Sequence, residues 1–326
     1  MSSLLVAGYG FLGANLAIIL KEEGLKPCIV ACKSSIRARS ILEEVFKNLD
    51  ATIIAFEELG LHEIKDALTR CRPSQIYYLA GAVRGAKRIW NAHTGLWSSL
   101  LEALLGFEGI ESIIYTSSVA SMGEATACIK EGYVVEEEEH LRGCKPRGVY
   151  EESKAEGERI GLKYYREYGL PVAIARPVML YGPYGYHLEW RMIYRLARFG
   201  IVLDAPVQTV FSLDAARALH FIASNIRASR GLWYIVAHPE GVSVGDVSRL
   251  LVKNMGNRIT ASLRLPWILG GLIAFFSRDE RPRLFARLQG YRYKPARLLE
   301  QGFKSWSSLE ESIHITLSWM RRAWGD

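Results

Sequence analysis

Tyr150 and Lys154 are the two residues whose types and spacing point most directly to proton chemistry. They lie four positions apart in GVYEESKAEGERI, a helical stretch that ends near Gly169 and Pro171, so both side chains share one helix face. A phenol has a pKa of about 10, and an ammonium group beside it favours the phenolate. We interpret Tyr150 as a candidate general acid or base with Lys154 beside it, although YxxxK alone is a common accident.

A group of hydroxyl side chains follows the apolar run SIIY. Thr116, Ser117 and Ser118 stand there, ahead of VASMG. If the run is a strand of a parallel sheet, these side chains lie at the carboxyl edge, where open α/β sheets bind ligands. A serine there can hold a substrate oxygen while Tyr150 moves its proton. The alternative interpretation is that the hydroxyls cap a loop.

Three glycines near the start of the chain, in VAGYGFLGANL, have GxGxxG spacing. They follow an apolar run and precede a helical pattern. Gly8 permits a tight turn, Gly10 lets the backbone approach a pyrophosphate, and Gly13 lets the helix pack closely on the strand. The turn, with Phe11 and Leu12, is predicted to bind dinucleotide phosphates at the helix N-terminus. A glycine turn without a ligand is the alternative.

The end of the second predicted strand, in ACKSSIRAR, indicates which dinucleotide binds. NAD sites of this type usually place Asp or Glu there, to hold the ribose 2′-hydroxyl. This chain instead offers two cations and a hydroxyl, from Lys33, Ser34 and Arg37, which suit a 2′-phosphate. We predict NADP as the cofactor, with NAD as a possibility and an ordinary basic helix start as the alternative.

Short apolar runs alternate with longer helical stretches along the first part of the chain. LLVAG, KPCIVAC, ATIIAF and SIIYTSS are among these runs, and several lack polar alternation, as strands buried on both faces should. The pattern predicts an α/β protein with a doubly wound parallel sheet, a Rossmann domain, over residues 1–180. A looser pattern predicts a smaller, interleaved substrate lobe over 181–326, from which about 209–240, with its strand-like run at 232–237, returns to the first domain.

Composition argues against several other classes of protein. With 326 residues, 49% of them hydrophobic, the chain can bury a large core, and its first apolar run leaves no room for a leader, so we expect a cytoplasmic protein. Five scattered cysteines without CxxC spacing predict neither a disulfide framework nor a metal site. The formal charge of +7 is not gathered into a basic run with aromatics, so we expect no nucleic-acid partner.

Taken together, the motifs resemble those of the extended short-chain dehydrogenase/reductase superfamily, which contains NAD(P)-dependent epimerases, dehydratases and 3β-hydroxysteroid dehydrogenases. GxGxxG, TSS ahead of a glycine, YxxxK and RPVMLYGP occur in the expected order. YLAG (78–81), VFSLDAARA (210–218) and LLEQGFKSWSSLEESI (298–313) extend the resemblance over nearly the whole chain. It implies an enzyme with a nicotinamide cofactor.

The resemblance implies three catalytic residues. Tyr150 would be the acid/base, and Lys154 would assist it and hold the nicotinamide ribose. Ser118 fits the third position because it stands five residues before Gly123. Ser117 is the fallback for this position.

The resemblance also implies cofactor contacts beyond the glycine turn. These fall on Leu79, Ala80, Gly81 and Pro177. Family members often place Asn early in the helix that follows YLAG. Here Asn91 and His93 compete for that position, and the choice stays open.

Relatives commonly form homodimers through the helix that carries YxxxK and the helix before it. In this chain the two helices correspond to about 149–168 and 87–106. Trp97, Tyr164 and Tyr165 are the expected aromatic anchors of such a contact.

Three departures from the family pattern weigh against nucleotide-sugar chemistry. Val119 and Ala120 occupy the place where related dehydratases carry Asp-Glu. Gln208 and Thr209 stand where sugar-nucleotide enzymes tend to carry an arginine. An epimerase normally retains NAD through its cycle, whereas the basic residues after the second strand favour exchangeable NADP(H).

The function we predict is an NADP(H)-dependent oxidoreductase that moves hydride between nicotinamide and a small-molecule secondary alcohol or ketone. Hydroxysteroid-dehydrogenase-like relatives have apolar segments in the region that corresponds to PWILGGLIAFF of this chain. This similarity favours a hydrophobic, steroid- or isoprenoid-like substrate. An NAD-dependent nucleotide-sugar epimerase is the alternative enzyme. A dinucleotide-sensing or assembly protein without turnover is the alternative of another class, although it would not need all three catalytic residues.

The apolar run PWILGGLIAFF at 266–276 is too short to span a bilayer. It is followed by the arginines at positions 278, 281, 283 and 287. This combination suits peripheral contact with an anionic membrane surface or uptake of a lipid-like substrate. Burial in the core of the lobe is the alternative.

Overall fold

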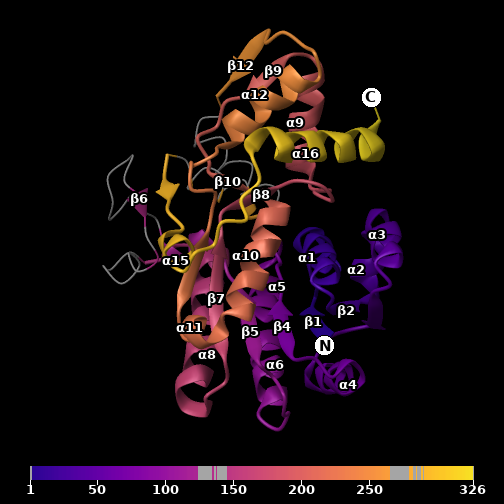
Figure 1. The fold of residues 1–326 in the computed structure, drawn as a ribbon, viewed down its shortest axis with the longest axis vertical. Coiled ribbons are helices and arrows are strands. Elements are labelled where there is room, and N and C mark those ends of the chain that lie inside the picture. Colours follow the sequence, from indigo (N-terminus) through magenta and orange to yellow (C-terminus); the bar gives the residue numbers. More distant parts are fainter. Residues whose placement is uncertain are drawn as a thin grey trace.

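A parallel β-sheet with helices on both faces organises the molecule, and a smaller lobe lies at one end (Figure 1). The computed structural model describes residues 2–123, 134–135, 137, 145–264, 279–281, 284, 288 and 290–325. The main sheet has seven parallel strands in the order β11-β7-β5-β4-β1-β2-β3. Their bounds are β1 Ser2–Val6, β2 Lys26–Cys32, β3 Thr52–Phe56, β4 Gln75–Tyr78, β5 Ser112–Thr116, β7 Val172–Pro177 and β11 Trp233–Val236. The predicted Rossmann fold is confirmed.

Helices cover both faces of this sheet because its central strands are apolar on both sides. Leu4 and Leu5 are each fully buried, and they pack into separate hydrophobic clusters on opposite faces. One face is covered by α1 Phe11–Glu22, α3 Glu43–Asn48 and α10 Ser212–Ser224. The other is covered by α4 Leu61–Cys71, α6 Leu96–Leu104 and α8 Val149–Tyr168. Shorter helical segments are α2 Lys33–Arg37, η1 Ser40–Leu42, α5 Ala86–Trp90, η2 Asn91–Gly95, η3 Val119–Met122, α11 Ile226–Ser229 and α15 Ala296–Glu300.

The smaller lobe has a hydrophobic core of its own. Its helices are α9 Leu188–Arg198, α12 Val244–Asn254 and α16 Leu309–Trp324. The paired short strands of the remaining sheets are β8 Met179–Tyr181 with β10 Thr209–Phe211, β9 Ile201–Leu203 with β12 Ala261–Leu263, and β6 Val134–Val135 with β13 Arg292–Tyr293. Ser243 begins α12 through a reciprocal capping box with Asp246, which satisfies backbone N–H groups at the helix start. The division into two domains stays a prediction.

The lobe and the sheet are interleaved along the chain. After β7 the chain enters the lobe at α9, and it returns as α10, which packs on α1. The strand β11 then joins the edge of the main sheet beside β7, at the place expected for the run 232–237. Later α15 packs on β11, and α16 ends the chain in the lobe. Among the helices of the described residues, none combines the length and apolar character needed to cross a membrane.

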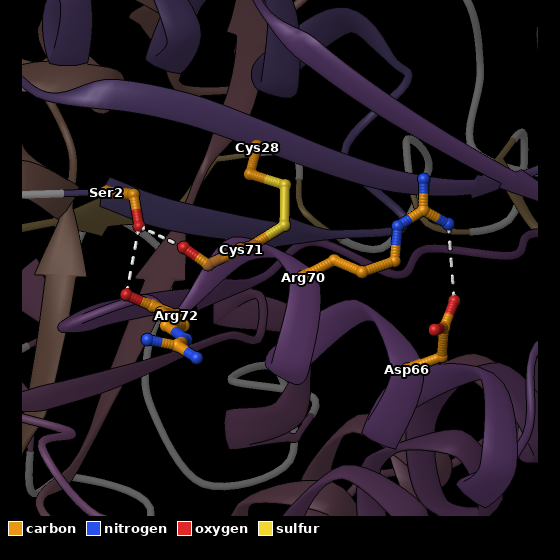
Figure 2. Close-up of a disulfide and its surroundings, with 6 residues drawn as sticks. All are labelled: Ser2, Cys28, Asp66, Arg70, Cys71 and Arg72. Atoms are coloured by element: carbon orange, nitrogen blue, oxygen red, sulfur yellow. Dashed lines mark hydrogen bonds and ion pairs between the residues drawn. A yellow bond between two sulfur atoms is a disulfide. The ribbon is translucent and has the colours of Figure 1, made fainter.

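Cys28 and Cys71 form a disulfide, which corrects the prediction from the sequence (Figure 2). Cys28 lies in β2 and Cys71 is the last residue of α4, with Cα atoms 6.2 Å apart. The Ser2 hydroxyl donates to the Cys71 carbonyl oxygen at 2.6 Å, so the end of α4 is also held to β1. The separation of 43 residues along the sequence did not predict this disulfide, because only the fold brings β2 and α4 together. Cys32 is a free cysteine.

Candidate active site

The glycine turn connects β1 to α1 and fits the pyrophosphate of a dinucleotide. A Cβ on Gly13 would lie 1.8 Å from the Gly8 carbonyl oxygen, and one on Gly8 would lie 2.4 Å from the Leu5 Cβ, so neither position accepts a side chain. Gly10 is the N-cap of α1, with no side-chain cap and no acidic residue in the first turn. A Cβ there would meet only the Tyr186 hydroxyl, at 3.9 Å. The helix N-terminus is therefore open to an anion.

Phe11 and Leu12 follow Gly10 at the start of α1 and pack within the chain. The Phe11 ring is buried and meets the ring of His187 edge-on at 6.0 Å between centroids. Leu12 packs against the core beneath α1. Both residues shape the turn, and its backbone faces the predicted phosphates.

The basic residues after β2 lie in and just beyond α2. The Lys33 ammonium forms an ion pair with Glu57, which follows β3, at 2.9 Å between Nζ and Oε1. Ser34 and Arg37 are exposed. Arg39, which no sequence motif indicated, donates to the carbonyl oxygen of Tyr9 in the glycine turn at 2.7 Å. A carboxylate thus lies among the predicted 2′-phosphate contacts, and an arginine adjoins the turn.

Tyr150 and Ser118 come together at the carboxyl ends of the strands. Tyr150 lies half-buried in the first turn of α8, and Ser118 begins η3 just after β5. Burial raises the pKa of Tyr150 to about 12, while a hydrogen bond from the Ser118 side chain opposes the rise. The Ala120 amide donates to the Ser118 Oγ at 3.2 Å and fixes the side chain. The predicted hydroxyl and phenol therefore share one site.

Lys154 lies one helical turn farther along α8 and is almost fully buried. Its ammonium donates to the Thr116 carbonyl oxygen at 2.8 Å and to the Ala80 carbonyl oxygen at 3.3 Å. It also lies 5.3 Å from the centre of the Tyr115 ring. Burial lowers the pKa of Lys154 to about 7, although the Glu158 carboxylate opposes this shift. Lys154 consequently joins α8 to the ends of β4 and β5.

The other predicted cofactor contacts border the same edge. Ala80 is buried, and Leu79 packs partly against the core. A Cβ on Gly81 would meet only the Leu79 carbonyl oxygen, at 4.0 Å, so the backbone there faces open space. Pro177 is the last residue of β7 and is buried beside β11.

The structure separates the roles of the two candidate serines. The Ser117 hydroxyl donates to Glu158 Oε1 at 2.5 Å, and the Ser121 hydroxyl donates to the same oxygen. Arg176 forms an ion pair with this carboxylate from β7. Burial raises the pKa of Glu158, but Arg176 and the two hydroxyls hold it below its usual value. Ser117 is engaged beneath the site, which leaves Ser118 for the position beside Tyr150.

His93, rather than Asn91, lies against the predicted catalytic residues. Asn91 is exposed, whereas the His93 ring is fully buried and meets the Tyr150 ring edge-on at 5.2 Å between centroids. His93 Nδ1 lies 2.8 Å from Ser153 Oγ, and the Ala82 amide donates to Nε2 at 3.4 Å. These partners assign the neutral ring with the proton on Nδ1. Burial and then the charge of Lys154 lower the pKa of His93, which keeps it neutral.

Local backbone features place His93 there. The segment η2 is a π-helical turn, a feature often found at functional sites. Gly157 of α8 lies close to it, since a Cβ there would stand 2.6 Å from the His93 carbonyl oxygen and 2.0 Å from the Tyr115 hydroxyl. The periodicity of a normal helix does not predict which residue a π-helical turn buries, so the sequence left the choice open.

Residues 279–281, which we call the strap, contact the loop after β4, and no sequence motif pointed to this contact. Arg84, in the loop after β4, pairs with Asp279 at 2.9 Å, and the Glu280 amide donates to the Val83 carbonyl oxygen at 2.9 Å. Arg281 continues the network to Asp279 and to Glu189 of α9. The strap links the lobe to the loop that borders the predicted cofactor site.

The predicted dimer helices show one clear correction. Trp97 is fully buried, and its indole N–H donates to the Gly157 carbonyl oxygen at 3.0 Å, so it cannot anchor a second copy. Tyr165 packs beside Gly231 within the chain. The ring of Tyr164 contacts the ring of Tyr168, an exposed residue, at 5.2 Å between centroids with the planes tilted by 40°.

A parallel sheet with a glycine turn after β1, beside a group of Ser, Tyr and Lys at the strand ends, defines a Rossmann-fold enzyme of the NAD(P)-dependent oxidoreductase type. Residues 4–237 match the NAD dependent epimerase/dehydratase family, and the chain belongs to that family. The resemblance noted in the sequence is thereby confirmed, and the cofactor is a nicotinamide dinucleotide.

Solved structures share this fold over almost their whole length. UDP-glucose 4-epimerase from Thermotoga maritima, with UDP-glucose, is 18% identical, with 99% of each chain covered and a TM-score of 0.73. dTDP-glucose 4,6-dehydratase from Bacillus anthracis, in complex with NAD, is 16% identical, with 99% of this chain and 97% of that chain covered and a TM-score of 0.74. UDP-glucuronic acid 4-epimerase from Bacillus cereus, in complex with NAD, is 16% identical, with 100% and 99% covered and a TM-score of 0.72. Such identities establish the fold alone, and no curated protein matches the sequence.

Proposed function

We propose that the protein is an NADP(H)-dependent oxidoreductase that interconverts a secondary alcohol and a ketone. The observation that carries the proposal is the convergence of Ser118, Tyr150 and Lys154 at the strand edge beside the open glycine turn. A bound nicotinamide dinucleotide would supply the hydride donor or acceptor. The side chains of the protein then need only bind the substrate oxygen and move one proton.

Tyr150 is the group placed to exchange that proton with the substrate oxygen. Ser118 lies beside its hydroxyl and can hydrogen-bond the same oxygen. Because the pKa of Tyr150 is about 12, it is a poor base at neutral pH until a positive charge lowers it. Lys154 lies on the same helix face, and its ammonium would supply such a charge when it is protonated. His93 holds the edge of the Tyr150 ring and the loop at Ala82.

The choice of NADP rests on the charges after β2. Arg37 is exposed and Arg39 adjoins the glycine turn, so two guanidinium groups can approach a 2′-phosphate. Cys32 ends β2 where an NAD site would place a carboxylate. Glu57 opposes this preference, since its carboxylate pairs with Lys33. Discrimination against NAD should therefore be moderate.

The decisive experiment is a turnover assay with NADPH and NADH against a panel of hydrophobic and polar ketones. Oxidation of NADPH by a ketone, lost in Tyr150→Phe, would support the proposal. Mass spectrometry of copurifying nucleotide is the companion measurement. A stoichiometric, retained NAD together with interconversion of UDP-sugars would replace the proposal with the epimerase. Nucleotide binding without turnover of any substrate class would favour a sensing protein.

An NAD-dependent nucleotide-sugar epimerase is the second candidate, and the strap favours it. Its ion pair between Arg84 and Asp279 holds the loop after β4, which follows the predicted cofactor contacts at 79–81, and such a hold suits a cofactor that stays bound. Gln208, in contrast, is buried and bonded to the backbone of Tyr293, so it is not available to a sugar diphosphate. Val119 and Ala120 are buried apolar residues and supply no acid or base.

A further inference from the structure

The helix α9 presents an unusual exposed face. Its opposite face packs into the core of the lobe through Trp190, Ile193, Tyr194 and Ala197. The exposed side chains include Leu188 and Met192, with 68% and 43% of their surface accessible, and Phe199, which directly follows the helix, with 75%. These three positions recur at helical spacing and form one stripe. Arg191, Arg195 and Arg198 form a second exposed stripe beside it.

The surface continues onto the neighbouring strand. The Thr260 hydroxyl donates to the Phe199 carbonyl oxygen at 3.0 Å, which places the residues before β12 next to the end of α9. Ile259 and Leu263 are exposed there, as is Arg258. Figure 1 shows β9 and β12 at the extreme end of the long axis of the molecule, with α9 close by. We call this the lobe-tip surface; it comprises Leu188, Arg191, Met192, Arg195, Arg198, Phe199, Arg258, Ile259 and Leu263.

Positive charge on the lobe-tip surface is not neutralised within the described part of the chain. The nearby acids are occupied, since Glu189 pairs with Arg281, and Asp204 pairs with Arg249 and Arg264. No described carboxylate forms an ion pair with the arginines of the surface. A second copy of the chain is a poor occupant, because a symmetric contact would bring like charges together.

We propose that the lobe-tip surface docks on an anionic lipid membrane. Arginines attract anionic headgroups, and adjacent Leu, Met, Ile and Phe side chains can enter the boundary between headgroups and acyl chains. Nucleic acid would use the arginines but leave the aliphatic side chains without a partner. The sequence predicts membrane contact at 266–276 with the arginines at 278, 281, 283 and 287, and all of these except Arg281 lie outside the described residues, so that prediction stays untested. The guanidinium of Arg281 is engaged by Asp279 and Glu189, whereas the arginines of α9 form no ion pair with a described carboxylate.

Vesicle sedimentation tests the proposal with the full chain. The unmutated protein should sediment with vesicles of phosphatidylglycerol and phosphatidylcholine but not with phosphatidylcholine alone, and salt at about 0.5 M should release it. The triple variant R191Q/R195Q/R198Q should lose about 100-fold in partition coefficient, from about fivefold for each arginine near an anionic surface. The matched control R227Q/R230Q/K304Q removes the same charge from exposed positions elsewhere and should bind normally.

A second pair of variants tests the apolar stripe. L188S/F199S should weaken vesicle binding at least tenfold while nucleotide binding and thermal unfolding stay unchanged, which shows that the chain is folded. Full vesicle binding by L188S/F199S, equal losses in the two charge variants, or no sedimentation with either vesicle at low salt would each overturn the proposal. So would tighter binding to duplex DNA than to the anionic vesicles under the same conditions.

Discussion

Reduction of the disulfide between Cys28 and Cys71 should destabilise the protein without changing its catalysis. The bond closes a loop with a sequence separation of 43 residues that contains β3 and most of α4. Loop-closure entropy in the unfolded chain then predicts a stabilisation of about 4 kcal/mol at 25 °C. Divided by the unfolding entropy expected for a chain of this length, this free energy corresponds to a Tm that is about 6 °C lower after reduction.

Differential scanning calorimetry with and without a reductant measures this shift. The unmutated protein should lose about 6 °C, C28A/C71A should not respond to the reductant, and C32S should behave as the unmutated protein does. A peptide map without reduction should contain the linked Cys28 and Cys71 peptides. Because the predicted catalytic residues lie on α8 and after β5, kcat at 25 °C should stay the same. An absent linked peptide, or an equal Tm in both states, would refute the reasoning.

Two further predictions concern catalysis and the cofactor, a third concerns stability, and a fourth concerns assembly. Tyr150→Phe should lower kcat about 100-fold or more while dinucleotide binding, followed by fluorescence titration, persists; full activity would disprove its assignment as the acid/base. Arg37→Ala should weaken NADPH binding by about 1.5 to 3 kcal/mol with little effect on NADH binding. Glu57→Gln should strengthen NADPH binding, because it frees Lys33 from its ion pair. If either variant changed the affinities for NADPH and NADH equally, the 2′-phosphate site would be contradicted. Burial lowers the pKa of Lys154 from 10.5 to about 7, so between these pH values the unfolded state binds more protons than the folded state. The free energy of unfolding of the unmutated protein, relative to that of Lys154→Met, should therefore rise by about 1.4 kcal/mol per pH unit in this window. A difference that does not change with pH would show that Lys154 is hydrated. Light scattering at micromolar concentration should give twice the 36.7 kDa chain mass if α5, α6 and α8 form the predicted homodimer, and a single mass would reject it.

The sequence predicted the sheet because both of its signals are local. Runs such as that around Leu4 and Leu5 are apolar at consecutive positions, which is typical of a strand covered on both faces. The roles of the glycines at 8 and 13 could also be predicted from the motif, since each fills a position where a side chain would collide with its neighbours. The local patterns and the family resemblance therefore predicted a doubly wound parallel sheet, whereas the order of its strands is known only from the structure.

What the sequence left open depends on contacts between distant segments. The ion pair of Lys33 with Glu57 and the burial of Trp97 under α8 arise only when separate elements pack. The position of His93 depends on a π-helical turn, which shifts the buried face relative to a regular helix. The roles of Ser117 and Ser118 were separated by the buried carboxylate of Glu158, which no spacing rule connects to them.

The interleaving of lobe and sheet has a consequence for synthesis on the ribosome. One edge of β7 pairs with β5, and the other edge pairs with β11, which is synthesised later and ends at Val236. Until that segment emerges, β7 presents unpaired backbone groups, and the face of α1 that packs on α10 stays exposed. The nascent chain thus carries an open strand edge and an apolar helix face while about sixty residues are added beyond β7, a span of several seconds at ordinary translation rates. Protection of this strand edge and this helix face during the interval should therefore raise the yield of folded protein.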